Sequence, residues 1–288
     1  MAAVYKAVTN SGDKSDAQAA GAKSARSVNQ QRVLILSSRG INYRHRHLLN
    51  DLSALLPHGR KEPKFDSKNK LYVLNELAEL YNCNNVLFLE ARKHEDLYMY
   101  LSKVPNGPTA KFHIQNIQTM EELNFTGNCL KGSRPILSFD SAFDKDPYLR
   151  VLRELFIHVF GVPPKARKSK PFIDRVLGFS IVDGRIWVRH YQITEEDTTE
   201  DKDMSLVEIG PRFCMTPIII QEGSFGGAII YENKQFVSPN QVRADLRRRT
   251  ASKHSSRQAQ SVELSAKKDR LIRTSGDVDA LDSKQLFA

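Results

Sequence analysis

Three neighbouring aspartates are the first residues of this chain whose type and spacing could support chemistry. Asp140, Asp144 and Asp146 are close enough in sequence to share a Mg²⁺ ion, which prefers carboxylate oxygens as ligands. Asp146 directly precedes Pro147, however, and this pair is typical of a helix N-cap followed by the first helical residue. We therefore favour a structural role for Asp146 and predict no metal site.

Two histidines could act on a phosphate ester. His45 and His47 lie among arginines and could contact phosphates or serve as general bases, although we favour a surface role at the start of a helix. The chain has no G-x-x-x-x-G-K-[ST] phosphate loop, no G-x-G-x-x-G and no G-x-S-x-G. The glycine-rich segment 223–227 lacks a lysine and precedes a predicted strand, so we interpret it as a tight connection. We expect no catalysis and no cofactor.

The cysteines and the apolar runs indicate the setting of the protein. Cys83, Cys129 and Cys214 are far apart and odd in number, so we predict buried structural thiols. The longest apolar runs, such as 33–36, are far shorter than the roughly 20 residues of a bilayer span. We expect a soluble intracellular protein.

The distribution of charge points to a partner. The chain has 288 residues, with 43 Lys+Arg and 33 Asp+Glu, and a formal net charge of +10. Basic residues cluster at 60–64 and 165–170, whereas 194–203 is acidic and is predicted to be a solvated loop. Basic clusters suit a polyanion, because each neutralised phosphate releases counterions. A merely soluble surface is the open alternative.

The hydrophobic pattern predicts an alternation of strands and helices. Residues 32–38 form a short apolar run typical of a buried strand. Asn42 can cap a helix that Pro57 ends, because the residue before a proline disfavours helical geometry. The pattern then predicts a helix over 71–81, strands at 86–89, 110–114 and 134–140, a helix from Pro147 with Gly161 as its C-cap, a hairpin around Asp183-Gly184, a strand over 213–219 and a hairpin over 228–237.

The two halves of the chain share this order of strands and helices, and a short sequence pattern also occurs in both. Gly107-Pro108 precedes Lys111 and Phe112, as Gly210-Pro211 precedes Arg212 and Phe213. We predict an α/β fold of two similar, intimately packed lobes, 32–130 and 131–240, between a disordered segment 1–31 and a basic tail 241–288. Ser238-Pro239 begins a last helix in that tail, which we expect to be ordered only against a partner. Phe112, Phe213 and Trp187 are predicted to be core residues.

Several of these segments resemble the Brix-domain family. The resemblance is carried by Leu36-Ser37-Ser38-Arg39-Gly40, by 105–112 and by 209–213, in the family's order, and it covers about 32–240. Residues 58–66 are most similar to a member that acts in maturation of the large ribosomal subunit. The resemblance implies two α/β lobes related to the anticodon-binding domains of some tRNA synthetases. It also implies a nucleolar assembly factor that binds precursor ribosomal RNA and a dedicated protein partner presenting a helix or an extended segment.

The basic loops and tail are therefore expected to contact RNA, with no membrane and no small-molecule substrate involved. Arg212 is the strongest candidate, because Gly210 and Pro211 let the backbone approach closely. The side chains expected to face RNA are Arg39, Arg60, Lys61, Lys64, Lys111, Arg134, Lys165, Arg167, Lys168, Lys170, Arg212, Arg247, Arg248 and Arg249. Two alternatives stay open: a protein-interaction scaffold with incidental RNA contact, and an enzyme acting on RNA, against which the missing motifs argue.

Overall fold

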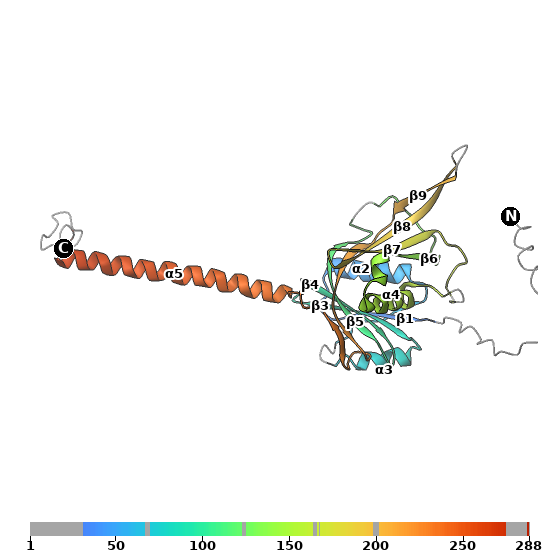
Figure 1. The fold of residues 1–288 in the computed structure, drawn as a ribbon, viewed down its shortest axis with the longest axis horizontal. Coiled ribbons are helices and arrows are strands. Elements are labelled where there is room, and N and C mark those ends of the chain that lie inside the picture. The colour runs from blue at the N-terminus through green and yellow to red at the C-terminus, as the bar shows by residue number, and fades with distance from the viewer. Residues whose placement is uncertain are drawn as a thin grey trace, which may run out of the picture.

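A computed structural model describes residues 31–66, 70–122, 125–163, 166, 168–197, 202–274 and 287 of the chain. The segment predicted to be disordered, apart from Gln31, lies outside these residues. The described residues form one curved sheet with helices packed against it, and a long C-terminal helix leaves the body as a rod (Figure 1). In this part of the chain no helix combines the length and the apolar character that a membrane span requires.

The elements of the two halves follow the same order along the chain. The first half contains β1 (Val33–Ser37), α2 (Tyr43–Leu55), β2 (Gly59–Lys61), α3 (Val73–Leu80), β3 (Asn85–Arg92), β4 (Asp96–Lys103) and β5 (Thr109–Gln118). The second half contains β6 (Pro135–Phe139), the 3₁₀ turn η1 (Ser141–Asp144), α4 (Pro147–Phe160), β7 (Arg175–Val182), β8 (Arg185–Asp197), β9 (Lys202–Glu208), β10 (Arg212–Gln221), β11 (Ile229–Glu232) and α5 (Pro239–Thr274).

The strand order shows the duplication directly. The sheet runs β2-β1-β3-β4-β5-β10-β8-β7-β6, with β9 beside β8 and β11 beside β10. Within each half a parallel pair, β1–β3 or β6–β7, is followed by two antiparallel pairings. The antiparallel pair β5–β10 joins the halves edge to edge. The predicted two-lobed α/β fold is confirmed.

The two faces of the sheet carry different layers. α2 and α4 cover one face of both halves, where Leu48, Leu152 and Phe156 are fully buried. Burying such a side chain contributes about 1.5–3 kcal/mol. α3 covers the opposite face of the first half with Leu74 and Ala78. Between α4 and β7 the described residues contain no helix, so the second half has no counterpart of α3 there.

The paired Gly-Pro turns have the same geometry in both halves. Gly107 and Gly210 adopt positive φ values of 89° and 79°, and each precedes a cis proline at the entry to β5 or β10. A Cβ atom on Gly107 would lie 2.1 Å from the Glu222 carbonyl oxygen, so no other residue fits there. The predicted strands follow these turns, with the Phe112 and Phe213 side chains in the core.

Three predictions about the second half are wrong. Most of the acidic segment 194–203 belongs to β8 and β9 instead of forming a loop; residues 198–201 lie outside the described part of the chain. A two-stranded antiparallel ribbon satisfies the backbone hydrogen bonds of this segment without burying apolar side chains. The hairpin over 228–237 is absent from the described fold, since β11 pairs back onto β10. Trp187 is half-buried on the outer face, because its neighbours Ile186 and Val188 take the inward positions.

Three smaller predictions also need correction. The surface role favoured for His45 is wrong, because this side chain is buried on the inner side of α2. Asp146 is the N-cap residue of α4 and Pro147 its first residue, as predicted, but the Asp146 side chain makes no capping hydrogen bond, and its backbone carbonyl accepts from Leu149 and Arg150. Cys129 is half-buried, whereas Cys83 and Cys214 are buried as predicted. By contrast, Asn42 caps α2 as expected, since its Oδ1 accepts from the Tyr43 amide at 2.7 Å.

Each half caps the helix of the other half. Arg175 and Asn85 are the first residues of β7 and β3 and so occupy equivalent positions. The buried Arg175 donates to the Leu55 carbonyl at the end of α2 and to the Ser133 carbonyl, both at 2.7 Å. Asn85 Nδ2 points to the His158 carbonyl at the end of α4, at 3.5 Å. At least one carbonyl in the last turn of each helix is therefore satisfied across the junction, at the negative end of the helix dipole.

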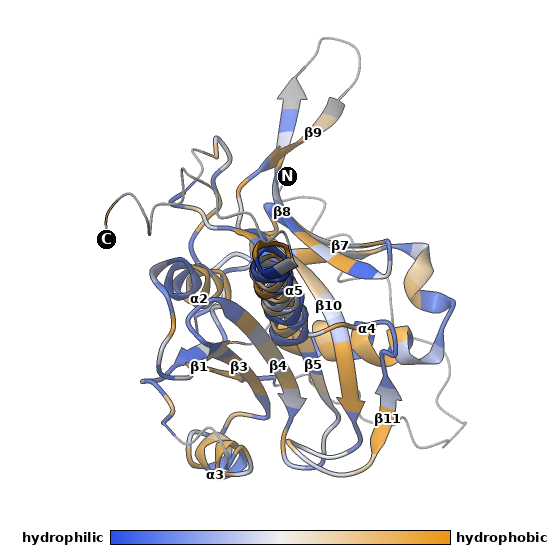
Figure 2. Ribbon diagram, turned by 90° about the vertical axis from the view of Figure 1, so that its left-hand side faces the viewer, coloured by the Kyte–Doolittle hydropathy of each residue, from blue (hydrophilic) through white to orange (hydrophobic). Residues whose placement is uncertain are grey.

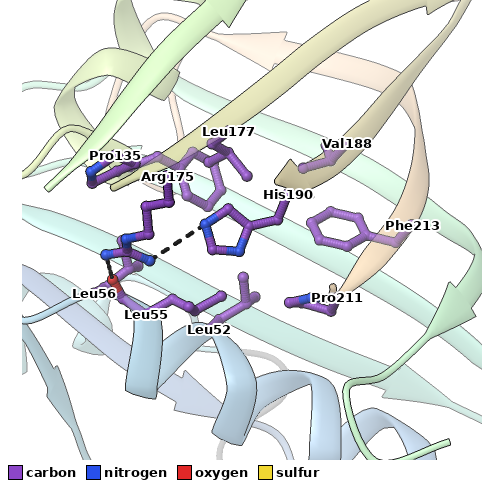
Figure 3. A pocket seen from close by; sticks show the side chains of 11 residues that line it. Leu52, Leu55, Leu56, Pro135, Arg175, Leu177, Val188, His190, Pro211 and Phe213 are labelled. Atoms are coloured by element: carbon purple, nitrogen blue, oxygen red, sulfur yellow. Dashed lines mark hydrogen bonds between the residues drawn. The ribbon is translucent and has the colours of Figure 1, made fainter. Parts of the chain in front are cut away.

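Two buried histidines complete this junction. His58 donates from Nε2 to the Val159 carbonyl at 3.1 Å. His190 Nδ1 donates to the Gly210 carbonyl at 3.0 Å, which leaves Nε2 as an acceptor 3.5 Å from Arg175 (Figure 3). Burial lowers the pKa of His58 to about 4, and burial together with the nearby Arg175 charge lowers that of His190 to about 4. Both rings are neutral near pH 7.

Replacing Arg175 with Met should weaken the whole fold. Methionine keeps most of the side-chain volume but removes the charged donor to the Leu55 and Ser133 carbonyls. We therefore expect the free energy of unfolding to fall by about 3 kcal/mol. Urea unfolding of the full chain measures this change. Arg189→Met on the exposed side of β8 is the matched control, and an equal loss in both variants would contradict the assigned role.

Acidification should destabilise the protein between about pH 6.5 and pH 4. In that window His58 and His190 become protonated in the unfolded chain but stay neutral in the folded chain. Proton uptake therefore lowers the free energy of unfolding by about 3 kcal/mol for each histidine. Below pH 4 this contribution is fully lost and no longer changes. Urea unfolding against pH should show a clearly smaller slope for His190→Gln and an unchanged slope for His254→Gln, which alters an exposed side chain on α5.

Candidate RNA interface

The first group of basic side chains gathers at the β2 edge of the sheet. β2 runs parallel to β1, with Lys61 opposite Ile35, and an isolated bridge then joins Phe65 to Ser38. This arrangement brings Arg60 and Lys61 to the sheet edge. Together with Arg39, which follows β1, the exposed side chains of this group are Arg39, Arg60, Lys61 and Lys64.

Most of these cations already have partners inside the molecule. Arg60 donates to Glu62 at 2.6 Å and lies 3.9 Å from the Tyr81 ring centroid. Lys61 donates to Asn50 at 2.6 Å, and Arg39 pairs with Asp66. Such exposed pairs are worth at most about 1 kcal/mol each and can exchange for phosphate. Lys64 makes no ion pair with any described residue.

The second group lies where β6 and β7 begin. The Lys170 amide donates to the Gly132 carbonyl at 2.7 Å, and the Arg134 amide donates to the Phe172 carbonyl at 3.0 Å. These bonds hold the loop after α4 beside the start of β6. Lys168 and Lys170 are exposed and form no ion pair within the described residues, and Arg134 is half-buried. The predicted contacts Lys165 and Arg167 lie outside the described residues.

Lys111 and Arg212 occupy a different surface, at the centre of the sheet. The Lys111 ammonium lies 5.2 and 5.1 Å from the ring centroids of Tyr98 and Tyr100, and burial lowers its pKa. Arg212 donates to Gln118 and, at 3.3 Å, to Glu208. Both predicted side chains therefore already interact with other residues of the fold, and they lie on a different surface from the two loop groups.

Arg247, Arg248 and Arg249 lie on α5, which leaves the body on the side of the sheet opposite α2 and α4 (Figure 2). Its first turns are fixed to the turn between β3 and β4. Arg243 donates to Glu95 at 2.9 Å and also pairs with Asp96, while Lys93 donates to Asn240. Beyond this anchor the helix is exposed on all sides.

Two cations that were not predicted from the sequence also face the outer side of the sheet. Arg185 follows the turn at Asp183 and Gly184, and Lys234 follows β11. Both are exposed. The signal that could have found Arg185 is its place directly after a predicted hairpin turn, where a strand's first side chain stays close to solvent.

The cavity between the two halves is too small for a substrate. The cavity at the junction, beside Arg175 and His190, has a volume of about 20 Å³, which is space for one water molecule (Figure 3). Asp140 caps η1 and Asp144 pairs with Arg153 at 2.6 Å. In the described part of the chain no three His, Cys, Asp or Glu side chains are grouped as a metal site would require.

This duplicated fold matches a known family. A family model described as "Brix domain" matches residues 38–219, from the end of β1 into β10. The chain belongs to the Brix-domain family. The resemblance seen in the motifs is therefore confirmed, and α5 lies beyond the matched part of the Brix domain.

Relatives of this Brix-domain chain are found in yeasts and in vertebrates. It is 56% identical to "Ribosome biogenesis protein BRX1" of Saccharomyces cerevisiae, covering 100% of both chains. It is 57% identical to "Ribosome biogenesis protein brx1" of Schizosaccharomyces pombe, over 81% of this chain and 79% of the relative. A crystal structure of a probable ribosomal biogenesis protein from Aeropyrum pernix K1 covers 65% of this chain and 96% of its own, with a TM-score of 0.45 and 15% identity.

Removing the Arg243 anchor should loosen the root of α5. A partly exposed ion pair contributes about 0.2–1 kcal/mol, so in Arg243→Leu we expect amide hydrogen exchange over 241–247 to accelerate by up to about fivefold. Mass spectrometry of the exchanged peptides measures the rate. Arg248→Leu removes only a 3.6 Å pair with Asp245 and is the control. Identical exchange in the two variants would show that Arg243 does not hold the helix.

Proposed function

We propose that this protein is a non-catalytic assembly factor in ribosome biogenesis. In this proposal it binds precursor RNA of the large ribosomal subunit, together with a protein partner, in the nucleolus. The names of its relatives support the coarser part of the proposal, since the budding-yeast and fission-yeast proteins and a human homologue that is 53% identical are all called ribosome biogenesis proteins. The RNA contact is argued from the surface of this chain.

The observation that carries the RNA contact is the composition of α5. From Arg243 to Arg273 the helix holds ten Arg and Lys against three Asp and Glu, and none of its residues, 239–274, is buried. Its apolar side chains form no continuous stripe, so the helix has no face with which to enter an apolar protein groove. A cationic rod of this kind suits the phosphates of RNA, because releasing their counterions favours binding.

The two loop groups extend this basic surface over the domain. Lys64, Lys168 and Lys170 are exposed and have no ion pair among the described residues, so a phosphate would not compete with an internal carboxylate. We infer that the domain that contacts RNA spans 32–240, with its two lobes dividing near 130. Structured RNA is recognised largely through shape and backbone contacts, which fits cations dispersed over several surfaces.

Reversing the charge of the second loop should weaken RNA binding in a salt-dependent way. For Lys168→Glu with Lys170→Glu, we expect lower affinity for precursor large-subunit RNA and a salt slope reduced by about one unit for each lost contact. Fluorescence anisotropy of the full chain over a range of salt concentrations measures both quantities.

The control for this experiment applies the same charge change elsewhere. Lys145→Glu with Arg189→Glu alters two exposed cations outside both loop groups. If both double variants had the wild-type salt slope, the loop after α4 would be excluded from the interface.

A protein-interaction scaffold is the second candidate, and one feature favours it. Three large apolar side chains are exposed at the edge of the second half: Ile136 (47%), Phe172 (56%) and Ile173 (52%). A group of exposed apolar side chains is typical of a protein-interaction surface. Affinity purification from cells after nuclease treatment separates the two functions. Assembly factors that stay bound to both double variants after nuclease would favour the scaffold.

A further inference from the structure

A cleft of about 890 Å³ opens on the outer face of the sheet, at the root of α5. Its floor includes Gln115 of β5 and Thr216 of β10, and its walls are the β7–β8 turn, the segment after β11 and the first turn of α5. Figure 2 looks along α5 toward this face, with β4, β5 and β10 around the base of the helix. The volume is in the range of about 300–1,000 Å³ that is typical of small-molecule and nucleotide sites.

The wall after β11 is held in place by one side chain. Asn233 donates from Nδ2 to the Pro217 carbonyl at 3.0 Å, and its Oδ1 accepts from the Gln235 amide at 3.0 Å. The turn that results places the Phe236 ring against the His113 ring, with 5.7 Å between the ring centroids. The opposite wall is fixed by the Arg243 anchor. The cleft is therefore built into the fold before any ligand arrives.

Asn233 and Arg243 hold the walls, but several other polar side chains in the cleft are not engaged by any described residue. Lys111 and Arg212, on the same face, are engaged by tyrosines or by a carboxylate. The lining side chains that make no hydrogen bond or ion pair to any described residue are Arg185, Lys234, Gln115, Thr216 and Gln235. Asp183 is the exposed acid at the rim.

We propose that this cleft binds one unpaired nucleotide of an RNA strand that runs along α5, an inference that rests on the proposed RNA-binding function. Arg185 and Lys234 contact the phosphates. Gln115 and Thr216 on the floor hydrogen-bond the edge of the base, and the exposed part of the Phe236 ring packs against it. Single-stranded RNA is recognised in this way, by hydrogen bonds to unstacked bases and by contact with aromatic side chains.

The position of the cleft favours RNA over an acidic peptide. Its rim includes Pro239, Val242 and Arg243, and the three arginines 247–249 follow one turn further along the same helix. A strand bound to that helix reaches the cleft without leaving basic surface. An amide and a hydroxyl on the floor can both donate and accept, as a base edge requires, whereas the carboxylates of an acidic peptide only accept hydrogen bonds.

The test compares two RNA shapes on the full chain. Fluorescence anisotropy is measured with a short labelled single-stranded RNA of mixed sequence and with a duplex of the same sequence. Arg185→Glu should lose about tenfold in affinity for the single strand, whereas Arg189→Glu, on the same strand and with the same charge change, should stay within about twofold. Gln115→Ala keeps the net charge and should lose about threefold to tenfold on the single strand only.

The outcomes distinguish a failure of the cleft proposal from a failure of the proposed RNA-binding function. Wild-type protein that binds neither RNA would overturn the proposed function and the cleft together. Wild-type binding with equal losses in Arg185→Glu and Arg189→Glu, or with Gln115→Ala weakening the duplex as much as the single strand, would overturn the cleft alone. Unchanged RNA affinity combined with loss of a nuclease-resistant protein from Gln115→Ala would assign the cleft to a protein instead. A circular dichroism melt at the wild-type temperature confirms that each variant is folded.

Discussion

α2 and α4 both end at the junction between the halves, where side chains of the opposite half contact carbonyls of their last turns. A buried helix end must find donors, and here each half supplies them to the other: Arg175 for α2, Asn85 and His58 for α4. This exchange makes either half incomplete alone. Together with the β5–β10 pairing it produces one rigid sheet, against which every surface feature of the protein is positioned.

This tight junction also determines where function can reside. The cavity at the junction holds about one water molecule, which is too little space for a substrate. Among the described residues, the surfaces suited to binding are the loops that follow α2 and α4, the helix α5 and the cleft at its root. The long helix α5 is attached to the body by a few polar contacts, chiefly those of Arg243 with Glu95 and Asp96. These contacts fix the direction of the helix and leave its surface exposed.

Patterns with a clear period were readable from the sequence. The cap at Asn42 and the stop at Pro57, the strand over 110–114 and the two Gly-Pro turns were predicted correctly, as was the repetition of the unit. β4 was missed because it is buried on both faces: Leu97 and Met99 enter one core while Tyr98 and Tyr100 enter the other, so no polar alternation marks it. The acidic ribbon was missed because exposed strands carry no apolar pattern.

The sequence by itself determined that the chain is basic, that its cations cluster after two helices and in a C-terminal helix, and that the α/β unit is repeated. Only the tertiary structure decided which cations are available. Arg212 was the strongest candidate from the sequence, yet Gln118, 94 residues away, accepts from its guanidinium, as does Glu208. Arg185 and Lys234, by contrast, lie beside a cleft and form no ion pair with any described residue. Charge is a property of the residue type, but its neutralisation depends on acids and rings that only strand pairing brings within a few ångströms.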